Sequence, residues 1–231
     1  MEEMEGYDMV NTMFSPEGRL RQVEYAAKTS KQGSPVIGIV CKDGVIILDH
    51  RREVKGNLRI MHTKQKIEEI DDHITMGISG IISDGALLAE SAQFESVNHE
   101  LTYGSAIDLK SIAGHISEIF QSYTQFSGVR PFGVSVIIAG IDDSGPGLFM
   151  LDPSGTFYGY KAICVGEHED EIKDIFRKKY KPKMNCEEAL AMAIKAFKEA
   201  LEKKFKIDLI QGKIMKVGSK KFEDLTAAQI K

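Results

Sequence analysis

The order in which apolar patterns follow one another constrains the fold of this 231-residue chain more than any other feature. Short apolar runs bounded by turn residues predict β-strands, and apolar residues spaced three and four apart predict amphipathic helices. The order is strands, two helices, strands, two helices and a last strand. The strand regions are expected at 35–48, 66–79, 133–161 and 209–217, and the helices at 87–97, 109–123, 169–180 and 186–205.

This order of elements predicts an α+β domain. The apolar faces are all buried if two antiparallel sheets face each other and each pair of helices covers one outer sheet face. The result is a four-layer α/β/β/α sandwich. The order alone also permits a two-layer α+β domain.

A β-hairpin is predicted near the N-terminal end of this arrangement. The apolar run 35–41 is separated from the run 45–48 by Lys42-Asp43-Gly44. An Asp-Gly pair supplies the positive φ that tight hairpin turns favour, so we expect it to form the turn. In the first helical pair, Asp108 stands just before the stripe that begins at Leu109 and is expected to stabilise the helix start.

A further helix is expected before the hairpin. Leu20, Val23 and Ala26-Ala27 form a short apolar stripe that runs to about Lys31, and Gly33 follows as a stop. Residues 1–17 show no sustained periodicity. We therefore expect an N-terminal tail at 1–18 and a single domain at 19–231.

Composition places this domain among ordinary globular proteins of a reducing compartment. Cys41, Cys164 and Cys186 are odd in number and widely spaced, which argues against a disulfide framework and a zinc site. The apolar runs are far shorter than the ~20 residues that span a bilayer, and the first five residues are acidic where a signal peptide is basic. A cytoplasmic protein without membrane contact is expected.

The positive charge of the C-terminal part does not predict nucleic-acid binding. Residues 170–231 carry 16 basic and 10 acidic side chains. The lysines alternate with glutamates on an amphipathic pattern and lack aromatic residues on which bases could stack. A solvated helix face explains them better.

Several stretches in the same order resemble the proteasome alpha subunits, over residues 7–217. The stretch 7–26 is the most specific, and two loop sequences depart from the family pattern, at Ser34-Pro35 and at Val165-Gly166-Glu167. The stretches 98–103 and 145–157 are most similar to the eukaryotic type-5 alpha subunit, and an archaeal alpha subunit is the alternative. The matching stretches are 7–26, 66–73, Ser79-Gly80, Tyr123-Thr124-Gln125, Gly128-Val129-Arg130-Pro131-Phe132-Gly133 and Asp152-Pro153-Ser154-Gly155.

The resemblance implies a sandwich of the N-terminal-nucleophile hydrolase type with an extra N-terminal helix. It implies a non-catalytic subunit of the seven-membered alpha ring of the 20S core particle, acting in assembly, gating and activator docking during intracellular protein degradation. The implied partners are other alpha subunits, beta-ring subunits, and an ATPase or other activator with C-terminal docking tails. The implied location is the cytoplasm, and also the nucleus if the chain is eukaryotic.

Five positions match the functional residues of this family. The resemblance assigns Tyr7, Asp8, Pro16 and Tyr25 to a cluster that holds the tail in the open-gate arrangement, and Lys66 to the capture of an activator's C-terminal carboxylate. The chemistry of the lysine side chain suits the role assigned to Lys66, because an ammonium forms a charge-assisted hydrogen bond with a carboxylate. Without the resemblance, Tyr7 would be read as a disordered tail residue, Tyr25 as core packing and Lys66 as an exposed strand lysine.

Catalysis by this chain is the competing interpretation. The related beta subunits use an N-terminal threonine, and alignment on Gly38 places Ser34 at its position, Lys66 at that of the assisting lysine and His50 at the acidic position. An internal serine has no α-amine to act as base, and Pro35 stiffens the backbone beside it. We therefore expect no catalytic residue. A self-processing peptidase using Ser34 and a purely structural ring scaffold remain the alternatives.

No cofactor or metal is expected. The glycines of Gly77-x-x-Gly80-x-x-x-x-Gly85 are not followed by the Lys-Ser/Thr of a phosphate-binding loop, and close packing explains them better. The acidic run that begins at His168-Glu169 suits a helix start, and no second ligand cluster is visible.

Overall fold

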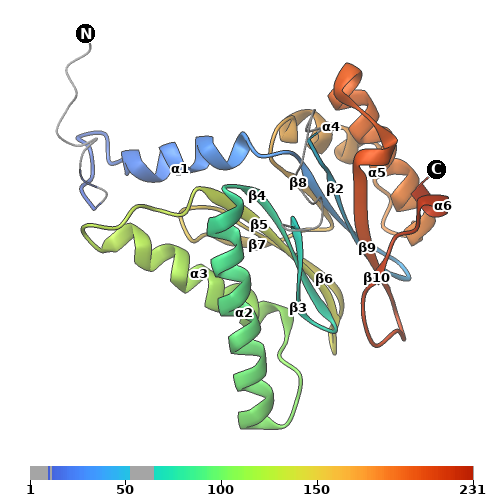
Figure 1. Cartoon of the computed structure of the whole chain (residues 1–231), viewed down its shortest axis with the longest axis horizontal. Coiled ribbons are helices and arrows are strands. Elements are labelled where there is room, and N and C mark those ends of the chain that lie inside the picture. The colour runs from blue at the N-terminus through green and yellow to red at the C-terminus, as the bar shows by residue number, and fades with distance from the viewer. Residues whose placement is uncertain (1–9, 11, 53–64, 231) are drawn as a thin grey trace, which may run out of the picture.

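The fold is a sandwich of two five-stranded antiparallel sheets, seen in a computed structural model that describes residues 10, 12–52 and 65–230 (Figure 1). One sheet has the order β10-β9-β2-β1-β8 and the other the order β3-β4-β5-β6-β7. The first sheet contains β1 (Val36–Cys41), β2 (Gly44–His50), β8 (Ala162–Val165), β9 (Ile210–Lys216) and β10 (Glu223–Asp224). The second contains β3 (Ile67–Asp71), β4 (Ile74–Gly80), β5 (Val134–Asp142), β6 (Gly145–Leu151) and β7 (Phe157–Gly159).

Two helices cover the outer face of each sheet. Helices α2 (Ile82–Tyr103) and α3 (Leu109–Gln125) pack on the second sheet, and α4 (Glu169–Lys179) and α5 (Cys186–Leu201) pack on the first. A separate apolar cluster between the sheets includes Val36, Ile47 and Ile137, each fully buried. This arrangement confirms the four-layer α/β/β/α sandwich and excludes the two-layer alternative. The 3-10 turns Glu202–Lys204 and Ile207–Leu209 lead into β9, and α6 (Ala227–Ile230) ends the described chain.

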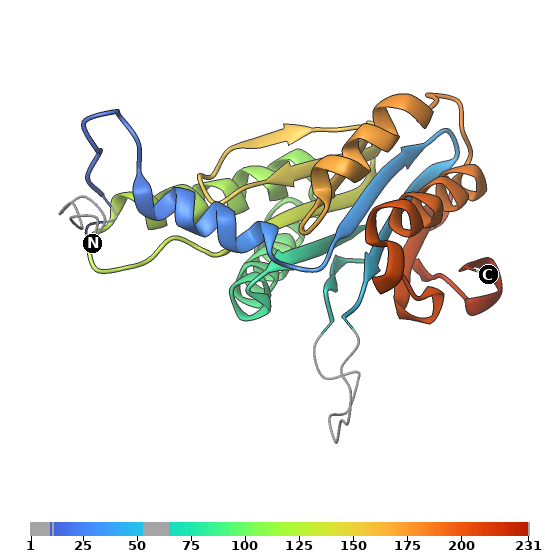
Figure 2. The same ribbon diagram turned by 90° about the horizontal axis from the view of Figure 1, so that it is seen from above.

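Helix α1 (Arg21–Lys31) lies across one end of the two sheets (Figure 1). It packs against β4 and β5, where Ala26 and Ser30 are buried. Its N-terminal half extends past the sheets, as the view from above shows (Figure 2). The expected N-terminal helix is therefore present, and only one of its ends is part of the core.

The first hairpin turn differs in detail from the sequence prediction, and the turn between β5 and β6 is shorter than its glycines and proline suggest. The first hairpin forms, but its turn is Lys42-Asp43, and neither Asp43 nor Gly44 has a positive φ. Gly44 is needed for packing, since a Cβ there would lie 2.1 Å from the carbonyl oxygen of Met215 on β9. Strand β6 begins at Gly145, because Gly145-Pro146-Gly147 pairs with the end of β5 and does not form part of the turn.

Local predictions about helix α3 and the glycine-rich stretch hold. Asp108 caps α3, accepting a hydrogen bond of 2.9 Å from the backbone nitrogen of Ser111. Gly85 lies against β4, and a Cβ there would come within 2.3 Å of the Ile78 side chain. Close packing therefore accounts for this glycine.

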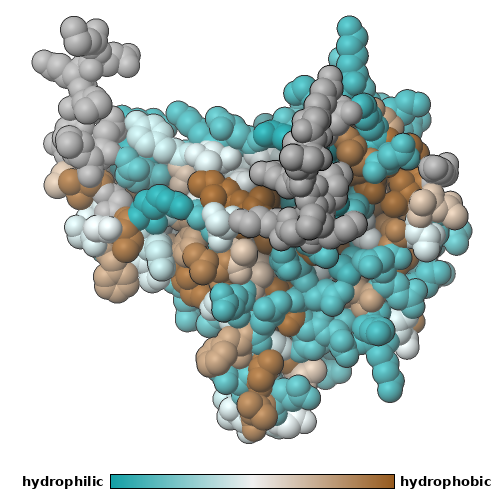
Figure 3. All heavy atoms as spheres, in the orientation of Figure 1, coloured by the Kyte–Doolittle hydropathy of each residue, from teal (hydrophilic) through white to brown (hydrophobic). Residues whose placement is uncertain are grey.

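The apolar residues that predict a helix at 87–97, namely Leu87, Phe94 and Val97, face solvent on α2. Leu88, Ala89 and Ala92 form the buried face of the helix, whereas Phe94 is 69% exposed and Leu101 80% exposed. Apolar side chains gather at the end of α2 that projects away from the sheets (Figure 3). None of the helices in the described part of the chain has the length and apolar character required to cross a membrane.

Candidate functional site

Lys66 and Ser34 meet at the ends of two strands that belong to different sheets. Ser34 stands just before β1, and Lys66 stands just before β3. The Lys66 ammonium donates hydrogen bonds to the Ser34 carbonyl oxygen at 2.5 Å and to the Ser34 hydroxyl at 3.0 Å. Lys66 is half-buried, so reading it as an exposed strand lysine is wrong.

Burial determines the protonation of this lysine. Loss of solvent contact lowers the pKa of Lys66 from 10.5 to about 8, and the negative charge of Asp49 is the main influence in the opposite direction. A pKa of about 8 leaves the amine largely protonated at neutral pH. Lys66 is therefore a hydrogen-bond donor in this site under ordinary conditions.

The acidic neighbour of Lys66 is Asp49, which the sequence analysis did not identify. Asp49 is 1% exposed near the end of β2, and burial raises the pKa of its carboxyl while Lys66 and Arg51 oppose that rise. The expected acidic position, His50, points to the other side of the sheet. Its Nε2 accepts a hydrogen bond from the backbone of Lys206, and its ring lies 5.9 Å from that of Phe197.

Strand alternation accounts for this difference. Successive side chains of a strand point to opposite faces, so Asp49 shares a face with Ile47 in the inter-sheet cluster, and His50 shares one with Leu48 under α5. The alternation was visible in the sequence. It would have placed Asp49, and not His50, between the sheets.

Serine side chains tie the end of α1 to the same site. The Ser79 hydroxyl donates to the carbonyl oxygens of Ser34 at 3.2 Å and Ser30 at 3.3 Å, and the Ser135 hydroxyl donates to the Ser30 hydroxyl at 2.9 Å. All four serines are less than 9% exposed. Hydrogen-bonded polar groups of this kind are costly to disturb when buried.

This geometry does not suit Ser34 as a nucleophile. Residue 34 lies inside the chain between Gly33 and Pro35, and the Gly33 carbonyl accepts a hydrogen bond of 2.7 Å from the backbone of Glu167. The nitrogen of Ser34 is therefore an amide and cannot act as a base. The Lys66 ammonium donates hydrogen bonds to both the hydroxyl and the carbonyl oxygen of Ser34, and these contacts hold Ser34 in position.

Pro16 and Tyr25, two of the residues expected to hold the N-terminal tail, lie toward the opposite end of α1. At Pro16 the chain forms a tight turn, in which the Gly18 backbone donates to the Ser15 carbonyl at 2.8 Å. Tyr25 is 41% exposed on α1 with the Lys28 ammonium 5.5 Å from its ring centroid, so the core-packing interpretation is wrong. Tyr7 and Asp8 lie outside the described residues. The length of α1, about 16 Å at 1.5 Å per residue, separates the Pro16 turn from Ser34.

The acidic run at the start of α4 takes part in ion pairs. Glu169 is 8% exposed and lies 3.0 Å from the Lys31 ammonium and 3.1 Å from that of Lys173. No three or more histidine, cysteine or acidic side chains gather as a metal site within residues 12–52 and 65–230.

Comparison with known families decides the identity of the fold. The family described as "Proteasome subunit" matches residues 30–215, and the N-terminal signature of the A-type proteasome subunits matches residues 7–28.

The chain belongs to the proteasome subunit family.

Named relatives of this proteasome subunit are alpha subunits. "Proteasome subunit alpha" of Methanocaldococcus jannaschii is 40% identical over 225 residues, which are 97% of this chain and 85% of the relative. The protein of the same name from Archaeoglobus fulgidus is 38% identical over 226 residues, which are 98% of this chain and 91% of the relative. The corresponding protein of Methanosarcina thermophila is 37% identical over 225 residues, with 97% and 91% covered. The resemblance to proteasome alpha subunits is thereby confirmed.

Proposed function

We propose that this proteasome subunit is a non-catalytic member of a seven-membered alpha ring, with roles in ring assembly, substrate gating and activator docking during intracellular protein degradation. The enclosed, internal position of Ser34 is the observation that supports a non-catalytic role. The threonine peptidase activity would belong to the beta ring on which the alpha ring stacks. A cytoplasmic location, and a nuclear one if the chain is eukaryotic, would go with this function.

Lys66 is the residue to which we assign activator docking. An ammonium has three donors, and the described contacts of Lys66 use two of them, both on Ser34. Counted over the described residues, one donor is left for the C-terminal carboxylate of an ATPase or other activator. An arriving carboxylate would also raise the pKa of Lys66 and so keep the amine charged.

Gating would involve the tail 1–18 and the exposed N-terminal half of α1. The turn at Pro16 reverses the chain before the helix, and Tyr25 projects from the helix on the same part of the molecule. A phenol can donate a hydrogen bond to a carboxylate, which suits the assignment of Tyr25, Tyr7 and Asp8 to one cluster. The Pro16 turn would direct the tail toward that cluster.

Assembly requires contact surfaces, and the described residues include at least two exposed apolar regions. One is at the turn before α1, where Phe14 is 64% exposed, and the other is the outer face of α2 with Phe94 and Leu101. A subunit that has lateral neighbours in its own ring and stacks on a second ring needs at least two interfaces. Large exposed apolar side chains are typical of such interfaces.

Replacement of Lys66 tests the proposed docking role. In the assembled particle, Lys66→Ala should reduce activator-stimulated peptide hydrolysis and leave unstimulated hydrolysis near that of the wild type. A charge-assisted hydrogen bond contributes about 1.5–3 kcal/mol, so an isolated docking peptide should bind about tenfold to a hundredfold more weakly. Lys66→Gln sharpens the test, because glutamine can still donate to Ser34 but carries no charge.

A matched control is Lys178→Ala, which removes an exposed lysine on α4. Equal stimulation of wild type and Lys66→Ala in a homomeric ring would contradict the docking role and favour a scaffold. Loss of unstimulated hydrolysis as well would indicate a structural role for Lys66.

A further inference from the structure

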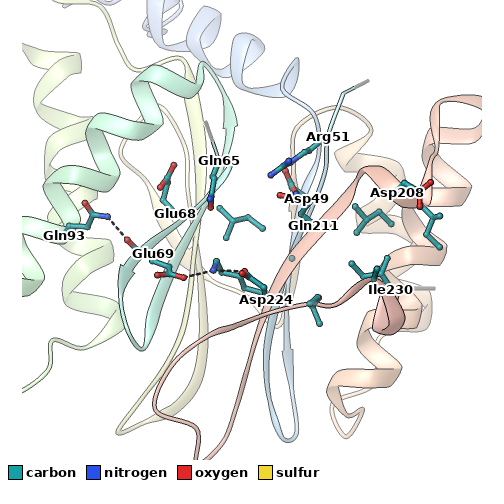
Figure 4. A pocket seen from close by; sticks show the side chains of 17 residues that line it. Asp49, Arg51, Gln65, Glu68, Glu69, Gln93, Asp208, Gln211, Asp224 and Ile230 are labelled. Atoms are coloured by element: carbon teal, nitrogen blue, oxygen red, sulfur yellow. Dashed lines mark hydrogen bonds and ion pairs between the residues drawn. The ribbon is translucent and has the colours of Figure 1, made fainter. Parts of the chain in front are cut away.

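A cavity of about 740 Å³ opens between the two sheets, and neither Ser34 nor Lys66 is among the residues that line it. Its walls come from the end of β2, from β3, and from β9 with the segment that follows it (Figure 4). Asp49 and Arg51 stand on one wall, and Gln65, Glu68 and Glu69 stand on the wall opposite (Figure 4). The cavity is therefore a second site, distinct from the docking lysine, whose side chain is bound to Ser34.

The lining of this cavity combines carboxylates with apolar side chains. Five acidic residues and two basic ones contribute to it. Branched aliphatic side chains complete the walls. The acidic residues are Asp49, Glu68, Glu69, Asp208 and Asp224, the basic ones are Arg51 and Lys213, and the aliphatic ones are Ile67, Ile207, Ile210, Leu225 and Ile230.

Lys213 already shows how these walls hold an alkylammonium group. Its ammonium lies 2.6 Å from a carboxylate oxygen of Glu69 and 2.8 Å from one of Asp224, and the residue is only 8% exposed. Its aliphatic stem packs inside while its charge pairs with acids from β3 and β10. These contacts pair the acidic side chains at one end of the cavity with a cation, whereas Asp49 at the other end has no such hydrogen-bonded cation among the described residues.

Asp49 is the feature that points to a ligand. It is 1% exposed, and neither carboxylate oxygen has a hydrogen-bond partner among the residues that the structure describes. Arg51 lines the same wall, and its positive charge and that of Lys66 act on Asp49, but among the described residues neither cation donates a hydrogen bond to the Asp49 carboxylate. A buried carboxylate without hydrogen-bond donors is unfavourable, so a cationic donor that reached it would be stabilised.

We propose that this cavity binds an alkylammonium ion, with the ammonium directed at Asp49 and the methylene chain along the isoleucine walls. The ion could be a free polyamine or the lysine side chain of a neighbouring subunit, since both present the same chemistry. A bare metal ion fits poorly, because the cavity is far larger than an ion and the described acids do not gather as a metal site. The proposal does not require Lys66 to dock an activator, although Asp49 also acts on the charge of that lysine.

Calorimetric titration of the full-length isolated chain with spermidine tests this proposal. Saturable binding is expected, and Asp49→Asn should weaken it about tenfold or more, as expected for the loss of one charge-assisted contact. The control Glu118→Gln removes the same charge from an exposed position on α3 and should leave the affinity unchanged. Equal binding by wild type and Asp49→Asn, or no saturable binding by the wild type, would overturn the proposal.

A second variant keeps the test valid if Asp49→Asn does not fold. Arg51→Gln removes the cation that stands beside Asp49 and should strengthen spermidine binding, because the competing charge is gone. Weaker binding by this variant would contradict the proposed position of the ammonium.

The same titration on the assembled particle distinguishes the two sources. If a lysine of a neighbouring subunit occupies the cavity, the isolated chain binds spermidine and the assembled particle does not. If both bind spermidine with the same dependence on Asp49, a free polyamine is the ligand.

Discussion

The two ends of α1 are held in different ways. At the C-terminal end, Ser30 is 2% exposed and hydrogen-bonds with Ser79 and Ser135 between the sheets and the helix. At the N-terminal end the helix extends past the sheets, and its contacts there include surface ion pairs of Glu24 with Arg19 and Arg21.

This difference shows which part of the helix its own subunit supports. Exposed ion pairs contribute little to stability, typically less than about 1 kcal/mol, whereas a buried hydrogen-bond network resists displacement. The C-terminal end therefore positions Ser34 and Lys66 firmly. The N-terminal end leaves apolar surface for a neighbouring subunit to stabilise.

The largest predicted effect comes from matched glycine substitutions at the two ends. Gly80 has φ +118°, and a Cβ there would lie 2.3 Å from the Gly133 carbonyl oxygen and 3.0 Å from the Cα of Ser30. Gly80→Ala should lower the free energy of unfolding by more than about 3 kcal/mol, because it combines backbone strain with a clash. Gly18 has φ +76°, and a Cβ there would meet nothing within 4 Å, so Gly18→Ala should cost about 1 kcal/mol. Urea denaturation of both variants checks this, and equal costs would refute the comparison.

An intermediate effect is expected from pH. Lys66 near the C-terminal end has a pKa lowered to about 8 by burial, whereas the pKa of Glu17 near the N-terminal end is lowered from 4.5 by its hydrogen bond with Ser15. Raising the pH from 7 to 9 should deprotonate Lys66 and weaken activator docking by about tenfold while leaving Glu17 ionised.

The lowered pKa of Lys66 also affects stability. The folded chain binds fewer protons than the unfolded chain between pH 8 and 10.5, so the contribution of this lysine to the free energy of unfolding rises with pH through that window.

Binding of an activator C-terminal peptide, measured from pH 7 to pH 9, checks the pH prediction. The variant Lys66→Arg should bind with little change over the same range, because a guanidinium stays protonated. A decline of the same size in that variant would show that another group titrates.

The smallest effect is expected from the same Glu→Gln substitution made in an ion pair at each end of α1, with the glutamate on α1 in one case and on α4 in the other. Glu24→Gln at the exposed end should change the free energy of unfolding by less than about 1 kcal/mol. Glu169→Gln at the other end should cost more, about 1–2 kcal/mol, because this buried carboxylate pairs with both Lys31 and Lys173. Thermal unfolding at low and high salt measures both, and a larger loss for Glu24→Gln would reverse the proposed difference between the ends.

Most of the fold could be predicted because its elements are long and periodic. The stripe from Leu109 to Tyr123 and the cap at Asp108 predict α3 with its correct start. The two-residue strand β10 and the four-residue α6 were missed, because elements this short have no period to detect. Pro146 stands in β6 although proline and glycine usually signal a turn, and only its pairing with Ile141 decides the matter.

The site could be predicted only in part. The resemblance brought Ser34 and Lys66 together, but their hydrogen bonds and the burial of the ammonium depend on how the two sheets pack, which no local pattern contains. Asp49 was missed because the alignment drew attention to His50, although strand alternation favours Asp49. The exposure of Tyr25 follows from the projection of α1 beyond the sheets, which a stripe on the helix does not reveal.

The central claim is that residues 1–33 belong to the functional subunit and that Ser34 never becomes a chain terminus. Intact-mass measurement of the chain isolated from the assembled native particle tests it directly. The account predicts a mass that includes α1 and the segment 32–33, because Ser30 and Gly33 are hydrogen-bonded into the site around Lys66. Recovery of a chain that begins at Ser34 would contradict the account and indicate a self-processing peptidase.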